Sequence, residues 1–226
     1  MKRLTEVVFI LDRSGSMAGL ESDTIGGFNS VLEKQKKLEG EVIVSTVLFN
    51  HKSQVLHDRI DIKQISVMTE KDYHASGCTA LLDAVGDAIW HIRNVHKYVR
   101  DEDRPGKTLF IITTDGMENS SQRFGYDEIQ KLIKEQKEQH GWEFLFLGAN
   151  IDAVRVAGRM GIKKEYAANF VNDRKGIAVN YKALNAAVEE CRRSSESGLH
   201  APDFLKSWKT EIDIDFAERG NIKGKL

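Results

Sequence analysis

Short apolar runs alternate along the chain with longer segments whose apolar residues recur every three or four positions. The first run, 7–11, has five consecutive apolar residues, which is typical of a strand buried on both faces of a sheet. Further runs predict strands at 42–49, 108–114, 143–147 and 166–171. Residues 55–62 alternate between apolar and polar, as an edge strand does, and the short 50–52 connection predicts an antiparallel hairpin.

Helical spacing fills the segments between the expected strands. The predicted helices cover 23–39, 79–98, a stretch beginning near Asp127, 152–160 and 181–193. We expect Ser22 or Asp23 to cap the first helix and Asp127 to cap the third. This alternation predicts an α/β fold: a Rossmann-like, doubly wound, mostly parallel six-stranded sheet with one antiparallel edge strand and helices on both faces.

Composition is consistent with one main domain at 1–195, followed by an extension at 196–226. The chain has 226 residues, 41% of them hydrophobic, which is enough for a sizeable core. The extension carries apolar residues whose packing the pattern does not predict: Phe204, Leu205, Trp208, Ile212, Ile214 and Phe216.

The net charge and the length of the apolar runs argue against several classes of function. The formal net charge of -1 gives no electrostatic case for binding nucleic acid or a membrane surface. The apolar runs are far shorter than the roughly 20 residues of a membrane span, and the first strand leaves no room for a signal peptide, so we expect a cytoplasmic protein. Cys78 and Cys191 have no CxxC spacing, which argues against a disulfide framework or a zinc site.

Oxygen-bearing side chains follow the two most apolar strands. Asp12 ends the first run, and Ser14 and Ser16 follow it around Gly15; Asp115 ends the run at 108–114. Ligands of open α/β sheets bind at the carboxyl ends of the strands, so the two acids face each other if their strands are neighbours where the strand order reverses. Thr79, at the start of the second helix, can close the same site.

Oxygen ligands without sulfur or imidazole suit Mg²⁺, Mn²⁺ or Ca²⁺. Each residue also has a simpler explanation: Asp12 and Asp115 as turn residues, the two serines as loop hydroxyls, and Thr79 as a helix N-cap. Only their combination indicates a metal site.

Three motifs together resemble the metal-ion-dependent adhesion site of von Willebrand factor type A (VWA) domains. Asp12-Arg13-Ser14-Gly15-Ser16 matches DxSxS, Thr79 matches the isolated threonine, and Thr114-Asp115-Gly116-Met117-Glu118-Asn119 matches TDGxxN. The resemblance covers about 4–193 and implies the VWA fold, in its stand-alone intracellular type. It also implies that Asp12, Ser14, Ser16, Thr79 and Asp115 hold the metal, with Mg²⁺ favoured and Mn²⁺ or Ca²⁺ as alternatives. Glu118 and Asn119 are expected to brace the loop.

The resemblance implies a metal-dependent protein-interaction module and no enzymatic activity. A partner protein would supply an Asp or Glu carboxylate to the cation. Some stand-alone relatives serve AAA-type ATPases, so such an ATPase or its client is a candidate partner. The alternative is a magnesium-dependent phosphatase or hydrolase using Asp12 as nucleophile. A haloacid-dehalogenase-like enzyme has a second acid where this chain has Ser14, and no GxSxG, GxGxxG or P-loop motif is present.

Three further expectations concern residues around the motifs. The family often has two glycines before the threonine, where this chain has Gly77-Cys78, so a side chain must be accommodated there. We expect Cys78 to pack under Thr79, with a reactive thiol as the alternative. Met17 is either part of a partner-facing apolar rim or a packed loop anchor. The seven histidines show no ligand spacing and are expected at the surface or in loops.

Overall fold

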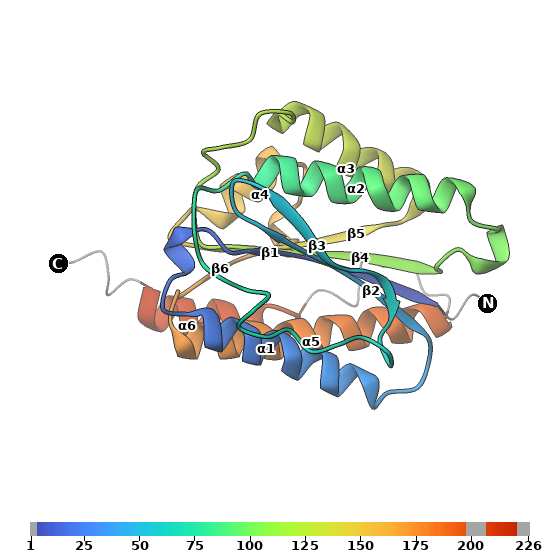
Figure 1. The fold of residues 1–226 in the computed structure, drawn as a ribbon, viewed down its shortest axis with the longest axis horizontal. Helices are drawn as coiled ribbons and strands as arrows, with labels where there is room; N and C mark the ends of the chain where they lie inside the picture. The colour runs from blue at the N-terminus through green and yellow to red at the C-terminus, as the bar shows by residue number, and fades with distance from the viewer. Residues whose placement is uncertain (1–3, 198–206, 221–226) are drawn as a thin grey trace.

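The strand that begins the chain lies in the middle of the sheet. The computed structural model describes residues 4–197 and 207–220, and its six strands have the order β3-β2-β1-β4-β5-β6 (Figure 1). The strands are β1 Thr5–Asp12, β2 Val42–Phe49, β3 Ser53–Asp61, β4 Lys107–Thr114, β5 Glu143–Ala149 and β6 Ala167–Phe170. The helices are α1 Glu21–Lys36, α2 Leu81–Tyr98, α3 Tyr126–His140, α4 Ala153–Arg159, α5 Arg174–Ser197 and α6 Thr210–Arg219.

The sheet topology confirms the expected fold class. β1 pairs in parallel with both β2 and β4, and β4, β5 and β6 continue the parallel sheet, whereas β3 runs antiparallel to β2 at one edge. The chain therefore reverses its direction of winding between β1 and β4. The carboxyl ends of these two strands lie side by side at that switch point, as the site prediction required.

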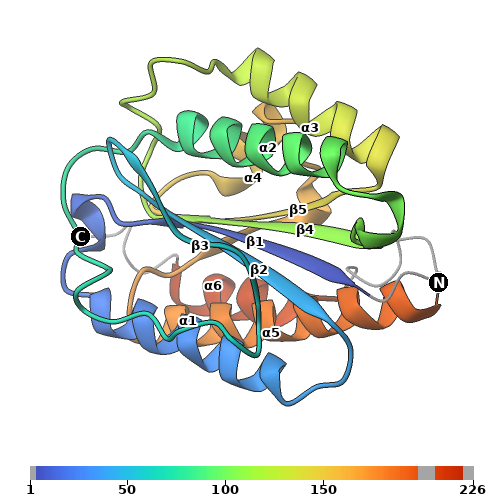
Figure 2. The same cartoon turned by 45° about the vertical axis from the view of Figure 1, so that its right-hand side comes forward.

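Two helical layers cover the sheet, and the β1 side chains divide between them. Val7, Phe9 and Leu11 pack with α1, α5 and α6, whereas Val8 and Ile10 pack with α2, α3 and α4 (Figures 1 and 2). Every residue of β1 is buried. An unbroken apolar run is the sequence signature of such a strand, because both of its faces lie in a core.

Several helix boundaries differ from the prediction. α1 begins at Glu21 and ends at Lys36, and its N-cap position is Leu20 instead of Ser22 or Asp23. α3 has Gly125 at its N-cap position, so Asp127 lies in the first turn. α5 begins at Arg174, seven residues before the predicted start, because the Asp173 carboxylate accepts the Gly176 N–H and supports a polar first turn that apolar periodicity does not reveal.

Other boundaries differ by only one or two residues. β3 is Ser53–Asp61 instead of 55–62, and β6 is Ala167–Phe170 instead of 166–171. α2 begins at Leu81, two residues after the predicted start. Strand and helix ends depend on tertiary hydrogen bonds, which residue patterns do not report.

Residues 207–220 pack on the core formed by α1 and α5. Trp208 and Ile212 are buried in that core, and the Trp208 indole N–H donates to the Glu165 carbonyl at 2.9 Å. Phe204 and Leu205 lie outside the described residues. Within residues 4–197 and 207–220, no helix combines the length and apolar character that crossing a membrane requires.

The expectation for the histidines is wrong at two positions. His57 and His96 are both buried, each at 8% exposure. His57 Nδ1 lies 3.0 Å from Thr46 Oγ1, and His96 Nε2 lies 2.6 Å from Glu6 Oε2. Each imidazole is buried with a polar partner from a neighbouring strand, which ligand spacing along the sequence does not detect.

Candidate metal centre

Three separate segments bring the predicted site residues together at the carboxyl edge of the sheet. Ser14 and Ser16 extend from the loop and 3-10 turn after β1, and their Oγ atoms lie 3.2 Å apart. The Ser16 hydroxyl donates to Asp115 Oδ1 at 2.5 Å, which joins this loop to the end of β4. The segments after β1 and β4 therefore meet through side chains, as the positions of the two strands in the sheet allow.

Gly116 leaves open a space that three hydroxyl oxygens surround. A Cβ atom built on Gly116 would lie 3.2 Å from Thr79 Oγ1, 3.5 Å from Ser16 Oγ and 4.0 Å from Ser14 Oγ. A side chain here would contact the Thr79 hydroxyl tightly and occupy the space between these oxygens. Three converging hydroxyls with two nearby carboxylates form an oxygen donor set that suits a small, hard divalent cation.

Asp12 is almost completely buried, at 2% exposure, and both of its carboxylate oxygens are engaged. Oδ1 accepts the Ser14 N–H at 2.7 Å, and Oδ2 accepts the Thr114 hydroxyl at 2.5 Å. Burial raises the pKa of Asp12 above its usual value, hydrogen bonds from Thr114 and Ser14 oppose that shift, and the charge of Asp115 adds to it. The carboxylates of Asp12 and Asp115 thus lie close together where little water solvates them, which disfavours their ionised forms. A bound cation would stabilise the ionised forms.

Asp115 receives a second hydrogen bond from a residue that sequence reasoning missed. The Asn172 side-chain amide donates to Asp115 Oδ2 at 2.8 Å, from the segment between β6 and α5. Burial raises the pKa of Asp115, whereas hydrogen bonds from Ser16 and Asn172 oppose the shift. Asn172 follows the last strand at the same edge, so the strand-end argument applied to Asp12 and Asp115 could have identified it.

Thr79 is held in place by its main chain, which leaves its hydroxyl available. The Thr79 N–H donates to Asn119 Oδ1 at 2.9 Å, and the Asn119 N–H donates to the Thr79 carbonyl at 3.0 Å. Thr79 is not the N-cap of α2, because the helix begins at Leu81 with Ala80 in the cap position. Asn119 therefore braces the loop, as expected.

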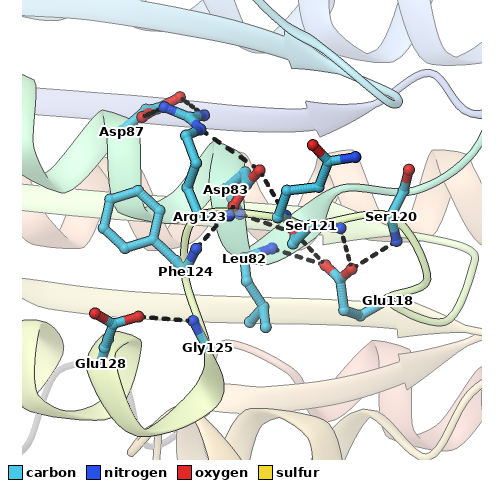
Figure 3. Close-up of polar contacts among 11 residues, drawn as sticks. Leu82, Asp83, Asp87, Glu118, Ser120, Ser121, Arg123, Phe124, Gly125 and Glu128 are labelled. Atoms are coloured by element: carbon cyan, nitrogen blue, oxygen red, sulfur yellow. Dashed lines mark hydrogen bonds and ion pairs between the residues drawn. The ribbon is translucent and has the colours of Figure 1, made fainter.

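Glu118 and the residues after it fasten the β4 loop to the start of α2 (Figure 3). The Glu118 carboxylate accepts N–H groups from Leu82 at 2.9 Å, Ser120 at 2.8 Å and Ser121 at 2.7 Å. The Leu82 N–H is one of the first-turn donors that have no partner inside a helix. Glu118 thus caps α2 from another segment and fixes the loop that carries Asp115, which confirms its expected bracing role.

Asp83 makes the reciprocal contact from α2 to the same loop. Its carboxylate accepts the N–H groups of Gln122, Arg123 and Phe124, each at 3.0 Å (Figure 3). Burial alone would raise the pKa of Asp83, but these three hydrogen bonds and the Arg123 charge outweigh it and hold the pKa below its usual value. The ionised carboxylate is therefore part of what stabilises the loop.

Replacing Asp83 by asparagine is expected to lower the free energy of unfolding by about 1–3 kcal/mol at neutral pH, because backbone donors lose an anionic acceptor. The pKa of Asp83 is lower in the folded protein than in the unfolded chain, where it is about 3.9. The ionised carboxylate therefore stabilises the fold at pH values above about 3.9, and this stabilisation is lost as the pH falls through the pKa of the folded state. The difference between wild type and Asp83→Asn should therefore shrink below about pH 4 in urea titrations. Asp127→Asn, an exposed acid on α3, should change stability by less than about 1 kcal/mol. An Asp83→Asn difference independent of pH would contradict this account.

Of the expectations for residues next to the motifs, the one for Cys78 is wrong and one of the two alternatives for Met17 is confirmed. Cys78 is exposed, so the expectation that it packs under Thr79 is wrong. The loop turns outward at Gly77, which has φ +75°, and the Gly77 carbonyl accepts the Gly15 N–H at 3.0 Å. Met17 is buried and is a packed anchor, whereas Met117, directly after Gly116, is 68% exposed.

Comparison with known proteins shows similarity at the level of structure alone. No protein-family model and no curated protein sequence matches the chain. A variant of the PilB minor pilin from Streptococcus sanguinis superposes with a TM-score of 0.59 and 9% identity, covering 86% of this chain and 63% of that one. Proximal thread matrix protein 1 from the mussel byssus, with a zinc-occupied metal-ion-dependent adhesion site (MIDAS) motif, superposes with a TM-score of 0.58 and 12% identity. The match covers 82% of this chain and 48% of that one.

A third structure carries the name of the fold. A von Willebrand factor type A protein from Catenulispora acidiphila has a TM-score of 0.52 and 14% identity, covering 80% of this chain and 42% of that one. The chain thus spans between 42% and 63% of the length of these three structures. With its six-stranded sheet, antiparallel edge pair and two helical layers, the chain has a VWA-like α/β fold.

Proposed function

We propose that this chain is a metal-dependent protein-interaction module. In this proposal Asp12, Ser14, Ser16, Thr79 and Asp115 hold a divalent cation, and a partner protein supplies an Asp or Glu carboxylate to it. The observation that carries the proposal is the convergence of three hydroxyl oxygens on the space left by Gly116. The zinc reported in the MIDAS motif of the mussel protein supports the idea that a site of this kind on this fold holds a cation.

The donor set favours Mg²⁺, with Mn²⁺ or Ca²⁺ as alternatives. All five proposed side chains offer oxygen, and three of them are uncharged hydroxyls. Mg²⁺ prefers oxygen ligands and usually keeps part of its coordination shell for water or substrate groups. Because the three hydroxyls are neutral direct ligands, a carboxylate from a partner could replace water at a remaining coordination position and supply a direct anionic oxygen.

Exposed apolar surface lies directly beside the site. Met117 follows Gly116 and is 68% exposed, so a partner that reaches the cation also meets this side chain. Methionine is flexible and polarizable, which suits it to contacts with differently shaped apolar groups. We therefore propose that the partner's acidic residue is flanked by an apolar one, with an AAA-type ATPase or its client as a candidate partner.

The geometry gives no support to the hydrolase alternative. A carboxylate nucleophile needs an accessible oxygen to attack its substrate. Asp12 is 2% exposed, and its two oxygens already accept hydrogen bonds from the Ser14 N–H and the Thr114 hydroxyl. We therefore do not propose an enzymatic activity, and we expect no magnesium-dependent turnover of phosphate esters.

Thr79→Val tests the interaction proposal with little change of shape. Valine keeps the main-chain hydrogen bonds with Asn119 and removes only the hydroxyl. We expect the immobilised wild-type chain to capture a protein from cell lysate in the presence of Mg²⁺, and we expect both chelator and Thr79→Val to abolish that capture. Thr108→Val, at the buried opposite end of β4, should leave capture unchanged.

Replacing the acidic residues of the captured protein one at a time should then identify a single Asp or Glu on which capture depends. Capture that persists in chelator and in Thr79→Val, or that survives every acidic replacement, would reject the metal-bridge proposal.

A further inference from the structure

A second polar cleft lies at the amino edge of the sheet, away from the candidate metal centre. It is lined by residues of the carboxyl-terminal halves of α2 and α3, together with Arg104 and Trp142. The two helices run side by side over one face of the sheet (Figures 1 and 2). Its volume is about 510 Å³, within the range of pockets that bind small molecules. No motif found in the sequence maps to this cleft.

Gln136, on the inner face of α3, lines the cleft and is unusual for its position. The preceding residues of the same stripe, Ile129, Leu132 and Ile133, are buried apolar residues, and a further apolar residue is expected where Gln136 lies. Gln136 is 0% exposed, and neither its Oε1 nor its Nε2 makes a hydrogen bond to any residue that the structure describes. A buried amide without partners is unfavourable, so this position indicates a ligand that offers a donor and an acceptor side by side.

The mouth of the cleft is positively charged. Arg93, Lys97 and Arg104 line it together with one carboxylate, Glu135, which lies 3.6 Å from the Arg93 guanidinium. Arg104 also lies 3.2 Å from the carboxylate of Asp101, outside the lining, so three cations face two acids. Basic residues in the last turn of a helix are common because they offset its negative end, and this explains Lys97. It explains neither Arg93, which lies more than one turn earlier, nor the buried Gln136 amide. The charge excess therefore suits an anionic ligand.

The walls of the cleft are aromatic and fixed. The Trp142 ring stacks on Phe110 with centroids 5.2 Å apart. Trp90 is 42% exposed, and the Arg93 guanidinium lies 4.0 Å from its ring centroid. His96, also in the lining, is oriented by Glu6, with Nε2 and Oε2 2.6 Å apart. The exposed Trp90 ring offers a flat surface to a planar ligand, whereas Trp142, at 2% exposure, supports the wall from behind.

We propose that this cleft binds a nucleoside monophosphate. Its base would contact the exposed ring of Trp90 and pair with the Gln136 amide, as glutamine pairs with the donor and acceptor of adenine. Because the Gln136 amide is buried in this structure, its side chain must turn toward the cleft when the base binds. Its phosphate would lie among Arg93, Lys97 and Arg104. The site does not depend on the proposed metal centre, because the two occupy opposite edges of the sheet.

Binding of AMP, GMP, CMP and UMP, measured by isothermal titration calorimetry on the full chain, tests this proposal. We expect at least one of them to bind with a dissociation constant of about 1 mM or tighter, and more tightly than either its nucleoside or inorganic phosphate. Gln136→Leu and Lys97→Gln should each weaken binding by about tenfold or more. Lys134→Gln, on the exposed face of α3, should not weaken it.

Gln136→Leu also controls for folding, because leucine suits the apolar stripe and its thermal midpoint should equal or exceed that of the wild type. Three results would overturn the proposal. One is no saturable binding of any of the four nucleotides up to about 10 mM. The second is inorganic phosphate binding as tightly as the nucleotide. The third is Lys134→Gln weakening binding as much as Lys97→Gln does.

Discussion

Mg²⁺ is expected to raise the thermal midpoint of the wild-type chain, and Asp12→Asn is expected to abolish that response. A ligand at about 100 times its dissociation constant stabilises the native state by about 2.7 kcal/mol. For a chain of this size that corresponds to about 5–10 °C. Asparagine can still accept the Ser14 N–H, but it removes one of the two negative charges proposed to hold the cation.

The same substitution should leave the metal-free protein as stable as the wild type, or more stable. Burial and the nearby charge of Asp115 both raise the pKa of Asp12, so the ionised carboxylate is unfavourable there without a counterion. Differential scanning calorimetry with Mg²⁺ and with chelator separates the two effects. The matched control is Asp83→Asn, which should lower the midpoint and keep the Mg²⁺ response, because Asp83 contacts the loop without lying at the site.

Two results would count against the metal centre. One is a wild-type midpoint that does not change with Mg²⁺, Mn²⁺ or Ca²⁺. The other is an Asp12→Asn variant that responds to the cation as strongly as the wild type does.

Two adjacent glycines in α1 should respond in opposite directions to replacement by alanine. A Cβ atom on Gly27 would lie 2.1 Å from Cδ2 of Tyr181, whose ring is buried where α5 packs on α1. Gly27→Ala must displace that ring or separate the helices, and we expect it to lower the free energy of unfolding by about 2–3 kcal/mol.

Gly26 is the matched control, since it occupies the same helix but is exposed. None of the described atoms outside its own helix turn and chain neighbours lies within 4 Å of a Cβ built on Gly26. Gly26→Ala should therefore stabilise the protein by up to about 1 kcal/mol, through helix propensity alone. Urea titrations of the two variants measure both effects. If both variants lose stability, the cost of alanine in α1 does not come from the contact with Tyr181, and this explanation is wrong.

The architecture was largely predictable, because it depends on signals carried by consecutive residues. The continuous apolar runs of β1 and β4 indicated strands buried on both faces, and the 50–52 connection indicated the β2–β3 hairpin. The motif residues were also found from local spacing, and the structure brings them together. Their role as metal ligands is still a prediction.

Other features were beyond the reach of the sequence. The Ser16–Asp115 hydrogen bond joins residues 99 positions apart. The strand-end argument could have identified Asn172 as a site residue, but its bond to Asp115 joins two loops that no motif connects. Capping of α2 by Glu118 is equally invisible, because capping patterns consider only neighbouring residues.

The sequence by itself determined the order of strands and helices from β1 to α5, the two-sided burial of β1 and the identity of the hydroxyls and acids at the strand ends. Periodicity and short motifs are local properties, so they can be read without a structure. Only the tertiary structure decided where Thr79 lies relative to Gly116, how α6 packs, and that Gln136 lies buried beside an open cleft. These features depend on contacts between distant segments, whose geometry is set when the whole core packs.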